Sequence, residues 1–390
     1  MLAEKPPMGF NTWNRFLDPA KDRVDISKVT EAAVLEMAQA MVDSGMLEAG
    51  YEYFVMDDCY QHLRRDHRGR LQSHPVRFPS GIKGLADAVH SLGLKFGLYS
   101  VPGSLTCAQQ YDDYHGDDLG SLNRERIDAE AFVEWGVDYL KYDWCRAHLN
   151  DGLIAEPTFA KMADELKAAG GNIVYSISEY GLFESHLWAP KFTNLWRTTD
   201  DLFANWGSIV RTIDQQIELY PYSRPGAWND PDMLQVGNGS LTDAENRAHM
   251  YVWAVLNAPL MAGNDLRRMT DTTRELLTHP GIIAINQDWG GQQGRLVWSD
   301  ADPAGAAATD HPTATTSKLP NGDLQVWAKT MSSGGRAVVL LNRGDQASKI
   351  SLPTALGELN RAKDVWSNDA VDPASTIELA PHSAELLLVS

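Results

Sequence analysis

Cysteine is scarce in this sequence: 390 residues include only Cys59, Cys107 and Cys145, so at most one disulfide can form and a disulfide scaffold is excluded. Basic residues are also few, since 34 Lys and Arg stand against 52 Asp and Glu, which gives a formal net charge of −18. Phosphate backbones and anionic lipids repel such a chain, so we expect no nucleic-acid and no membrane partner. No apolar run approaches the roughly 18 residues that a membrane-spanning helix needs.

Motifs for common cofactors are missing as well. The sequence contains no CxxC, HxH or HExxH, and no GxxxxGK[ST] or GxGxxG. We therefore predict neither a metal site nor a nucleotide cofactor. The opening MLAEKPPMGF lacks the basic and apolar stretches of a secretory signal. We expect a cytoplasmic protein if Met1 is the native start and a secreted one if a leader was removed; the sequence defines no oligomeric state.

Short apolar segments alternate with helical patterns over the first three quarters of the chain. Strands are predicted at residues 8–13, 53–57, 95–100, 137–143, 173–179, 195–199, near 227, and 259–263. Residues 28–46 show helical spacing, and Thr242 to Glu245 form a capping box that opens a helix to about Leu256. Eight strands alternating with helices predict an α/β fold, a (β/α)8 TIM barrel at this length. The alternative, an open doubly wound sheet, usually carries a glycine-rich phosphate loop that is missing here.

The last hundred residues have a different pattern. Residues 301–322 are rich in Ala, Thr, Asp and Pro and predict a loop. Short alternating segments follow at 324–330, 336–342, 348–352, 361–366, 376–379 and 384–389. Turn residues separate them at near-regular spacing, which is typical of a small antiparallel β-sandwich. We predict a catalytic barrel domain over residues 1–290 and a C-terminal β-sandwich domain over 291–390.

Polar side chains recur where the predicted strands end, at the barrel edge where active sites are built. They are Asp57, Asp58, Tyr99, Lys141, Asp143, Glu179, Arg197, Asp201, Asp230 and Asp232. Tyr139, Lys141 and Asp143 share one face of a strand because side chains repeat every second residue. A neighbouring lysine keeps a carboxylate ionised, as a nucleophile must be. A structural ion pair is the alternative for this pair.

Asp201 supplies a second carboxylate from another strand. Two carboxylates that converge on one pocket suit glycoside hydrolysis, in which one attacks the anomeric carbon and the other protonates the leaving oxygen. They could also hold a metal ion, but supporting histidines are missing. The 12 tryptophans offer flat faces for sugar rings.

The motifs resemble glycoside hydrolase family 27, the retaining α-galactosidases and α-N-acetylgalactosaminidases. The similar segments run in order between about Pro6 and Asp288: PPMGFNTWN, VMDDCY, GLKFGLYS, WGVDYLKYDWC, SISEYG, WRTTDD, GAWNDPDMLQVGNG and NAPLMAGNDLR. The resemblance implies Asp143 as nucleophile and Asp201 as acid/base. It implies substrate-binding roles for Trp13, Asp57, Asp58, Tyr99, Lys141, Glu179, Arg197 and Asp232. It also implies a Cys107–Cys145 disulfide and leaves Cys59 as a free thiol.

Several positions depart from the pattern of this family. Val101 replaces an acid, Trp144 follows the nucleophile where a small or polar residue is usual, and Asp200 replaces a glycine before the acid/base. The loop 107–121 is longer and more acidic than usual. The bulky segment 179–183 is similar to that of the galactosidases and argues against a substrate with a 2-acetamido group.

We therefore predict a retaining, exo-acting α-galactosidase that acts on an oligosaccharide or polysaccharide without a cofactor. The departures leave two alternative substrates open, an isomaltose-type α-1,6-glucan and a β-L-arabinopyranoside. A carbohydrate-binding protein without catalytic activity is a more distant alternative, which the intact Asp143 and Asp201 oppose. A metal-dependent hydrolase is another, and retained activity in EDTA would exclude it.

Overall fold

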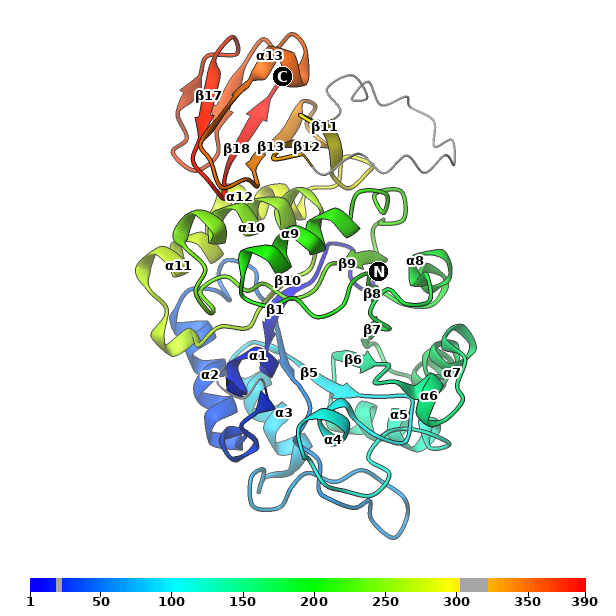
Figure 1. Ribbon diagram of the computed structural model, residues 1–390. Helices are drawn as coiled ribbons and strands as arrows, with labels where there is room; N and C mark the ends of the chain where they lie inside the picture. The colour runs from blue at the N-terminus through cyan, green and yellow to red at the C-terminus, as the bar shows by residue number, and fades with distance from the viewer. Residues whose placement is uncertain (19–22, 302–321) are drawn as a thin grey trace. The chain divides into compact units, whose positions relative to one another are not determined.

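A computed structural model describes residues 1–18, 23–301 and 322–390 (Figure 1). Apart from its two ends, the loop expected at 301–322 lies outside these residues. The chain consists of two compact units. The first comprises residues 1–201, 226–233 and 259–269, and the second comprises 202–225, 234–258 and 270–390. The predicted domain boundary at residue 290 stays a prediction.

The first unit contains an eight-stranded parallel sheet with the order β10-β1-β4-β5-β6-β7-β8-β9. Its strands are β1 Met8–Asn11, β4 Tyr53–Met56, β5 Lys95–Ser100, β6 Tyr139–Asp143, β7 Val174–Ser178, β8 Leu195–Arg197, β9 Trp228–Asp230 and β10 Leu260–Ala262. All eight coincide with predicted strands. Among the described residues β9 and β10 form no ladder with each other, so the sheet curls into a barrel that is incompletely closed.

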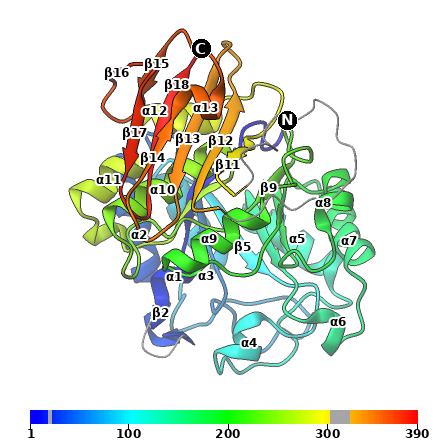
Figure 2. The same ribbon diagram turned by 45° about the horizontal axis from the view of Figure 1, so that its top comes forward.

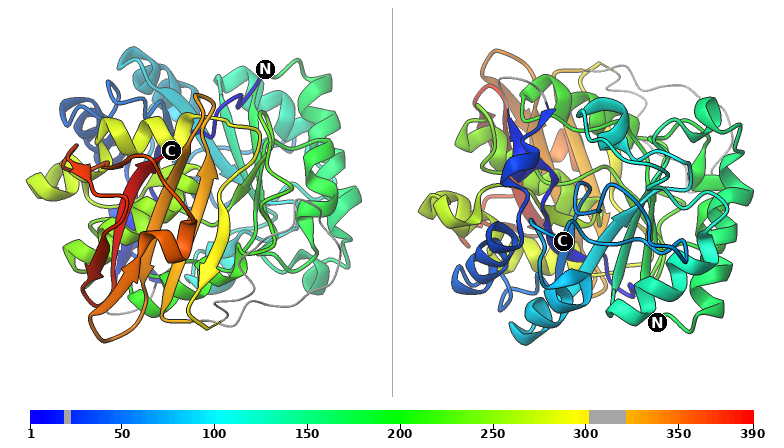
Figure 3. Two further views of the ribbon diagram at one scale, coloured as in Figure 1. Left: turned by 90° about the horizontal axis from the view of Figure 1, so that it is seen from above. Right: turned by 90° about the horizontal axis from the view of Figure 1, so that it is seen from below.

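Helices of the first unit connect successive strands and lie outside the sheet (Figure 3). The longer ones are α2 Glu31–Asp43, α3 Gly81–Ser91, α5 Glu125–Trp135 and α7 Ala155–Ala168; the short ones are α1 Trp13–Phe16, α4 Cys107–Tyr111, α6 Ala147–Asn150 and α8 Ser185–Trp188. The helix expected at 28–46 begins later because Thr30 caps α2, accepting a hydrogen bond from the Ala33 N–H. The helices cover the outer face of the curled sheet and side chains fill its interior, which explains the continuous burial of β1, β4 and β7.

Side chains from several strands fill the interior of the curled sheet. Tyr53, Val55, Tyr139, Val174, Leu195 and Met261 form one buried apolar cluster. Along β6, alternation then brings Lys141 and Asp143 to the same inner face as Tyr139. The apolar cluster thus lies in the interior of the sheet, and the polar ends of the strands lie beyond it, at the carboxyl-terminal edge.

The second unit combines helices with antiparallel sheets. Its helices are α9 Trp206–Gln215, α10 Asp243–Val255, α11 Asp271–Leu277, α12 Pro280–Gln287 and α13 Leu352–Leu356. The predicted capping box opens α10, with Thr242 and Glu245 bonded reciprocally. No described helix of either unit has the length and apolar character to cross a bilayer.

One six-stranded sheet has the order β11-β12-β13-β18-β15-β16, and β14 pairs with β17 (Figure 2). These strands are β11 Arg295–Ser299, β12 Leu324–Thr330, β13 Arg336–Asn342, β14 Ser348–Ser351, β15 Ala362–Asp364, β16 Ala370–Val371, β17 Thr376–Leu379 and β18 Ser383–Val389. The six predicted strands are confirmed, while β11 and β16 were not predicted. Val326, Val338, Leu340, Ile350 and Leu387 belong to the apolar core that the two sheets share.

Candidate active site

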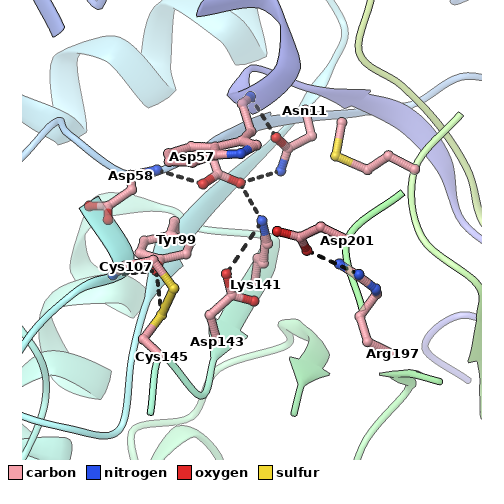
Figure 4. A network of polar contacts seen from close by, with 12 residues as sticks. Asn11, Asp57, Asp58, Tyr99, Cys107, Lys141, Asp143, Cys145, Arg197 and Asp201 are labelled. Carbon is pink, nitrogen blue, oxygen red and sulfur yellow. Dashed lines mark hydrogen bonds and ion pairs between the residues drawn. A yellow bond between two sulfur atoms is a disulfide. The ribbon is translucent and has the colours of Figure 1, made fainter. Parts of the chain in front are cut away.

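The centre of the candidate active site is Lys141 on β6. Its Nζ lies 2.8 Å from Asp57 Oδ2 and 3.5 Å from Asp143 Oδ2, so one ammonium group joins the ends of two strands (Figure 4). The expected contact between Lys141 and Asp143 is therefore confirmed. Burial alone would lower the pKa of Lys141, but the Asp143 and Asp57 carboxylates raise it, so the lysine stays protonated.

Asp143 ends β6 with a side chain that is only 8% exposed. Burial raises its pKa to about 7, while the positive charge of Lys141 acts in the opposite direction. Among the residues that the structure describes, none donates a hydrogen bond to Asp143 Oδ1. Oδ1 is thus a buried oxygen, and the carboxylate is held through Oδ2 by the Lys141 ammonium.

Asp57 and Asp58 follow β4 and are both buried. Asp57 Oδ2 accepts hydrogen bonds from Asn11 Nδ2 at 2.7 Å and from Lys141. Asn11 Oδ1 in turn accepts the Trp13 N–H at 2.8 Å, which ties the start of α1 to the same network. Asp58 is held by the backbone N–H groups of Cys59 and Ala108, and burial raises its pKa to about 6.

Arg197, the last residue of β8, organises the other side of the site. Its guanidinium lies 3.0 Å from Asp232 and 3.1 Å from Asp201. Asp201 differs from Asp143 in exposure, since 55% of its side chain is accessible. Asp200 points a carboxylate oxygen at the Asp201 backbone N–H, at 2.9 Å, and so belongs to the local turn.

The expected disulfide joins Cys107 on α4 to Cys145, two residues after the end of β6, and the buried Cys59 is a free cysteine. The Tyr99 hydroxyl lies 3.2 Å from Cys145 Sγ, and the Tyr180 hydroxyl lies 3.2 Å from Cys107 Sγ. In the described parts of the chain one group of potential metal ligands occurs, Cys107, Asp143 and Cys145. Because its two sulfurs are bonded to each other, this group does not offer thiolate ligands.

A pocket opens among these strand ends. Its lining residues are Asn11, Tyr139, Lys141, Ser176, Ser178, Arg197, Asp230, Asp232, Met233 and Met261. Lys141, Arg197, Asp230 and Asp232 are among the polar residues expected at the strand ends, whereas Asn11 and Met233 had no predicted role. Asn11 could have been found, because it ends the first strand as Asp143 ends the fourth.

Glu179 lies differently from its predicted role in substrate binding. Its side chain is fully buried, and its two oxygens accept the backbone N–H groups of Phe183 at 2.6 Å and Ser185 at 3.3 Å. Trp144 is also buried, 1% exposed, and packs among aromatic rings. The geometry therefore gives no support to contact of Glu179 with substrate, and it places Trp144 beneath the loop rather than in the pocket.

A curled parallel sheet with two carboxylates of unlike exposure at its carboxyl-terminal edge is the arrangement of a barrel glycoside hydrolase. A sequence model described as "Alpha galactosidase A" matches residues 5–288, and one described as "Alpha galactosidase C-terminal beta sandwich domain" matches residues 321–389. The chain belongs to the α-galactosidase family, glycoside hydrolase family 27, and is a glycoside hydrolase.

Individual relatives agree with this assignment. "Alpha-galactosidase 2" from Arabidopsis thaliana is 39% identical over 99% of this chain and 89% of its own length. "Alpha-galactosidase A" from Cellvibrio japonicus is 40% identical over 89% of this chain and 78% of its own length. Among solved structures, alpha-galactosidase I from Mortierella vinacea has a TM-score of 0.84 and 29% identity, covering 100% of this chain and 97% of that one.

Proposed function

We propose that this glycoside hydrolase removes terminal α-D-galactosyl residues from oligosaccharides or polysaccharides by double displacement, with Asp143 as nucleophile and Asp201 as acid/base. The observation that carries the proposal is the unlike setting of the two carboxylates. Asp143 is buried beside the Lys141 ammonium, whereas Asp201 is exposed to water beside Arg197. The similarity to enzymes named α-galactosidases supports the choice of sugar.

In the first step, an Asp143 oxygen forms a bond to the anomeric carbon while the glycosidic C–O bond breaks. The proton of Asp201 passes to the leaving oxygen. In the second step, Asp201 takes a proton from water, whose oxygen attacks the anomeric carbon and releases Asp143. Lys141 offsets the negative charge of Asp143 in the free enzyme and keeps a donor at the pocket, while Asp57 and Arg197 offer groups for sugar hydroxyls.

Initial rates on a panel of nitrophenyl glycosides and isomaltose oligomers test the proposal. We expect a strong rate on the α-galactoside and retention of anomeric configuration in the product, observed by NMR. A preference for the β-L-arabinopyranoside or the α-1,6-glucan in kcat/KM would overturn the choice of sugar. Inversion of configuration would overturn the assignment of Asp143 as nucleophile.

A further inference from the structure

Asn11, the last residue of β1, lines the pocket with a side chain that is almost completely buried. In the register of β1 and β4 it pairs with Val55, which belongs to the apolar cluster inside the curled sheet. Asp57 follows Val55 by two residues, so alternation brings Asp57 to the same inner face. The register of two neighbouring strands therefore explains why the Asn11 amide meets the Asp57 carboxylate.

The Asn11 amide is bonded at both of its ends. Nδ2 donates to Asp57 Oδ2 at 2.7 Å, and Oδ1 accepts the Trp13 N–H at 2.8 Å in a local turn between β1 and α1. A carboxylate only accepts and a backbone N–H only donates, so these partners define which end of the amide faces which group. Aspartate at this position would place an acceptor against the Asp57 oxygen, and leucine would offer neither group.

Asp57 Oδ2 is shared between two donors. It accepts from Asn11 and also from Lys141 Nζ at 2.8 Å, while Asp57 Oδ1 accepts the Asp58 N–H at 2.8 Å. Lys141 reaches Asp57 across the intervening strand β5, where its Nζ lies 5.4 Å from the centroid of the Tyr99 ring. The position of the ammonium therefore depends on where Asp57 Oδ2 is held, and Asn11 holds that oxygen from β1.

The second contact of the ammonium is the longer one. Lys141 Nζ lies 3.5 Å from Asp143 Oδ2, compared with 2.8 Å from Asp57. The Lys141 charge lowers the pKa of Asp143, whereas the Asp57 charge raises it. Because the attraction between charges falls with distance, a shift of the ammonium toward Asp57 weakens its effect on Asp143. The contacts form one continuous chain, which begins at Asn11 and ends at Asp143 (Figure 4).

We propose that Asn11 is a positioning residue: by holding Asp57 Oδ2, it keeps the Lys141 ammonium shared between Asp57 and Asp143 and so favours the ionised form of Asp143. Without the amide donor, the Asp57 carboxylate draws the ammonium toward itself, and Asp143 loses part of its cationic partner. This effect belongs to the free protein and requires no sugar. Its consequence for turnover rests on the proposed function.

Titration of the Asp143 carboxyl carbon by NMR tests the proposal without a substrate. The protein is labelled with ¹³C-aspartate, and D143N assigns the signal. Leucine has nearly the shape of asparagine but no donor, so in N11L we expect the pKa of Asp143 to rise by at least about 0.5 above the wild-type value. An unchanged pKa would overturn the positioning role. Should N11L fail to fold, N11A removes the same donor and allows the same titration.

N194L is the matched control. Asn194 directly precedes β8, at the opposite edge of the same sheet. Its amide is also bonded at both ends, since Oδ1 accepts the Tyr175 N–H at 3.0 Å and Nδ2 donates to the Gly226 carbonyl at 2.9 Å. Both partners are backbone groups, so the same substitution should leave the pKa of Asp143 at the wild-type value. An equal rise in N194L would assign the effect to general loss of packing and overturn the proposal.

N11D tests the donor through pH. Its carboxylate repels Asp57 when ionised, whereas its protonated form donates to Asp57 Oδ2 as the amide does. We therefore expect the ratio of kcat/KM in N11D to that in the wild type to rise at least about fivefold between pH 8 and pH 5, on the nitrophenyl glycoside that the wild type cleaves fastest. The native titratable and charged groups around the pocket are present in both proteins, so their own titration largely cancels in the ratio; they are Asp57, Asp58, Tyr99, Tyr139, Lys141, Asp143, Arg197, Asp201, Asp230 and Asp232.

The two readouts separate the positioning role from the proposed function. A merely structural loss in N11D would lower kcat/KM equally at every pH. If the ratio is independent of pH while the pKa of Asp143 rises in N11L, the positioning role stands and Asp143 is not the nucleophile. If the pKa does not move in N11L, the positioning role fails whatever the kinetics show.

Discussion

The two sides of the active site carry the same functional group in different surroundings. On the β6 side, Asp143 is 8% exposed and contacts a lysine that Asp57 also holds. On the β8 side, Asp201 is 55% exposed and contacts Nη2 of Arg197. Nη1 of the same guanidinium contacts Asp232. Each carboxylate therefore has one cationic partner, but only one of them is withdrawn from water.

This difference suits the two chemical roles that we propose. A nucleophile gains from a fixed orientation and from loss of hydration, both of which the buried Asp143 has. An acid/base must exchange protons with a leaving group and then with water, which suits the exposed Asp201. In many enzymes, two carboxylates of one pocket have different functions because their environments differ.

Removing Asp143 should have the largest effect on catalysis. We expect D143A to lose at least about 10⁴-fold in kcat, because Asp143 is the one carboxylate that β6 contributes to the site. Added azide should restore turnover and give the glycosyl azide of inverted configuration, since azide then attacks from the face that Asp143 occupied. Product analysis by NMR is the measurement. A retained azide product would assign the nucleophile elsewhere.

Removing Asp201 should have a smaller and selective effect. We expect D201A to lose about 10²–10⁴-fold on substrates with poor leaving groups. A dinitrophenyl galactoside, whose leaving group needs no proton, should be spared in the first step. Azide should here yield the product of retained configuration, because Asp143 is intact. Equal losses on both substrates would argue against an acid/base role.

The charge of Lys141 should affect the pH dependence of catalysis. As the proposed nucleophile, Asp143 must be ionised, so kcat/KM should fall as the pH drops below the pKa of about 7 that burial produces. Lys141 lowers that pKa; removing its charge in K141M should therefore move the acidic limb to higher pH by about one unit or more. The pH profile of kcat/KM measures the shift, with K141R as the variant that keeps the charge. A limb that stays in place would exclude Lys141 as the electrostatic partner.

Much of this arrangement follows from sequence periodicity. Most of the eight parallel strands were predictable because they are short apolar runs, and the alternation along β6 placed Lys141 and Asp143 on one face. The weakest pattern is that of β9, whose sequence is WND. Residues outside the strands were less predictable. Trp144 is adjacent to the nucleophile in the sequence, but the turn at Cys145, with φ +42°, and Arg146, with φ +60°, brings His148 back beside the indole ring.

The strand β16 was missed for a related reason. It has only two residues, so its pairing with β15 rather than local sequence defines it. The strand β11, Arg295–Ser299, is longer than several strands that were predicted, and its apolar residues could have revealed it. Asn11 was missed as a site residue because its role depends on a contact with Asp57, 46 residues away in the sequence.

Glu179 provides the test with the smallest expected effect on catalysis. It is more completely buried than Asp143, yet its oxygens accept backbone N–H groups of its own loop rather than facing a lysine. E179Q replaces one acceptor with an amide donor that opposes an N–H. We therefore expect a loss of about 1–3 kcal/mol in the free energy of unfolding, measured by denaturant titration, with kcat on the α-galactoside within about threefold of wild type. A drop in kcat close to that of D201A would instead place Glu179 among the groups that contact the substrate. We expect no such drop, because burial alone does not give a carboxylate a chemical role. A cation beside the carboxylate and an accessible oxygen do.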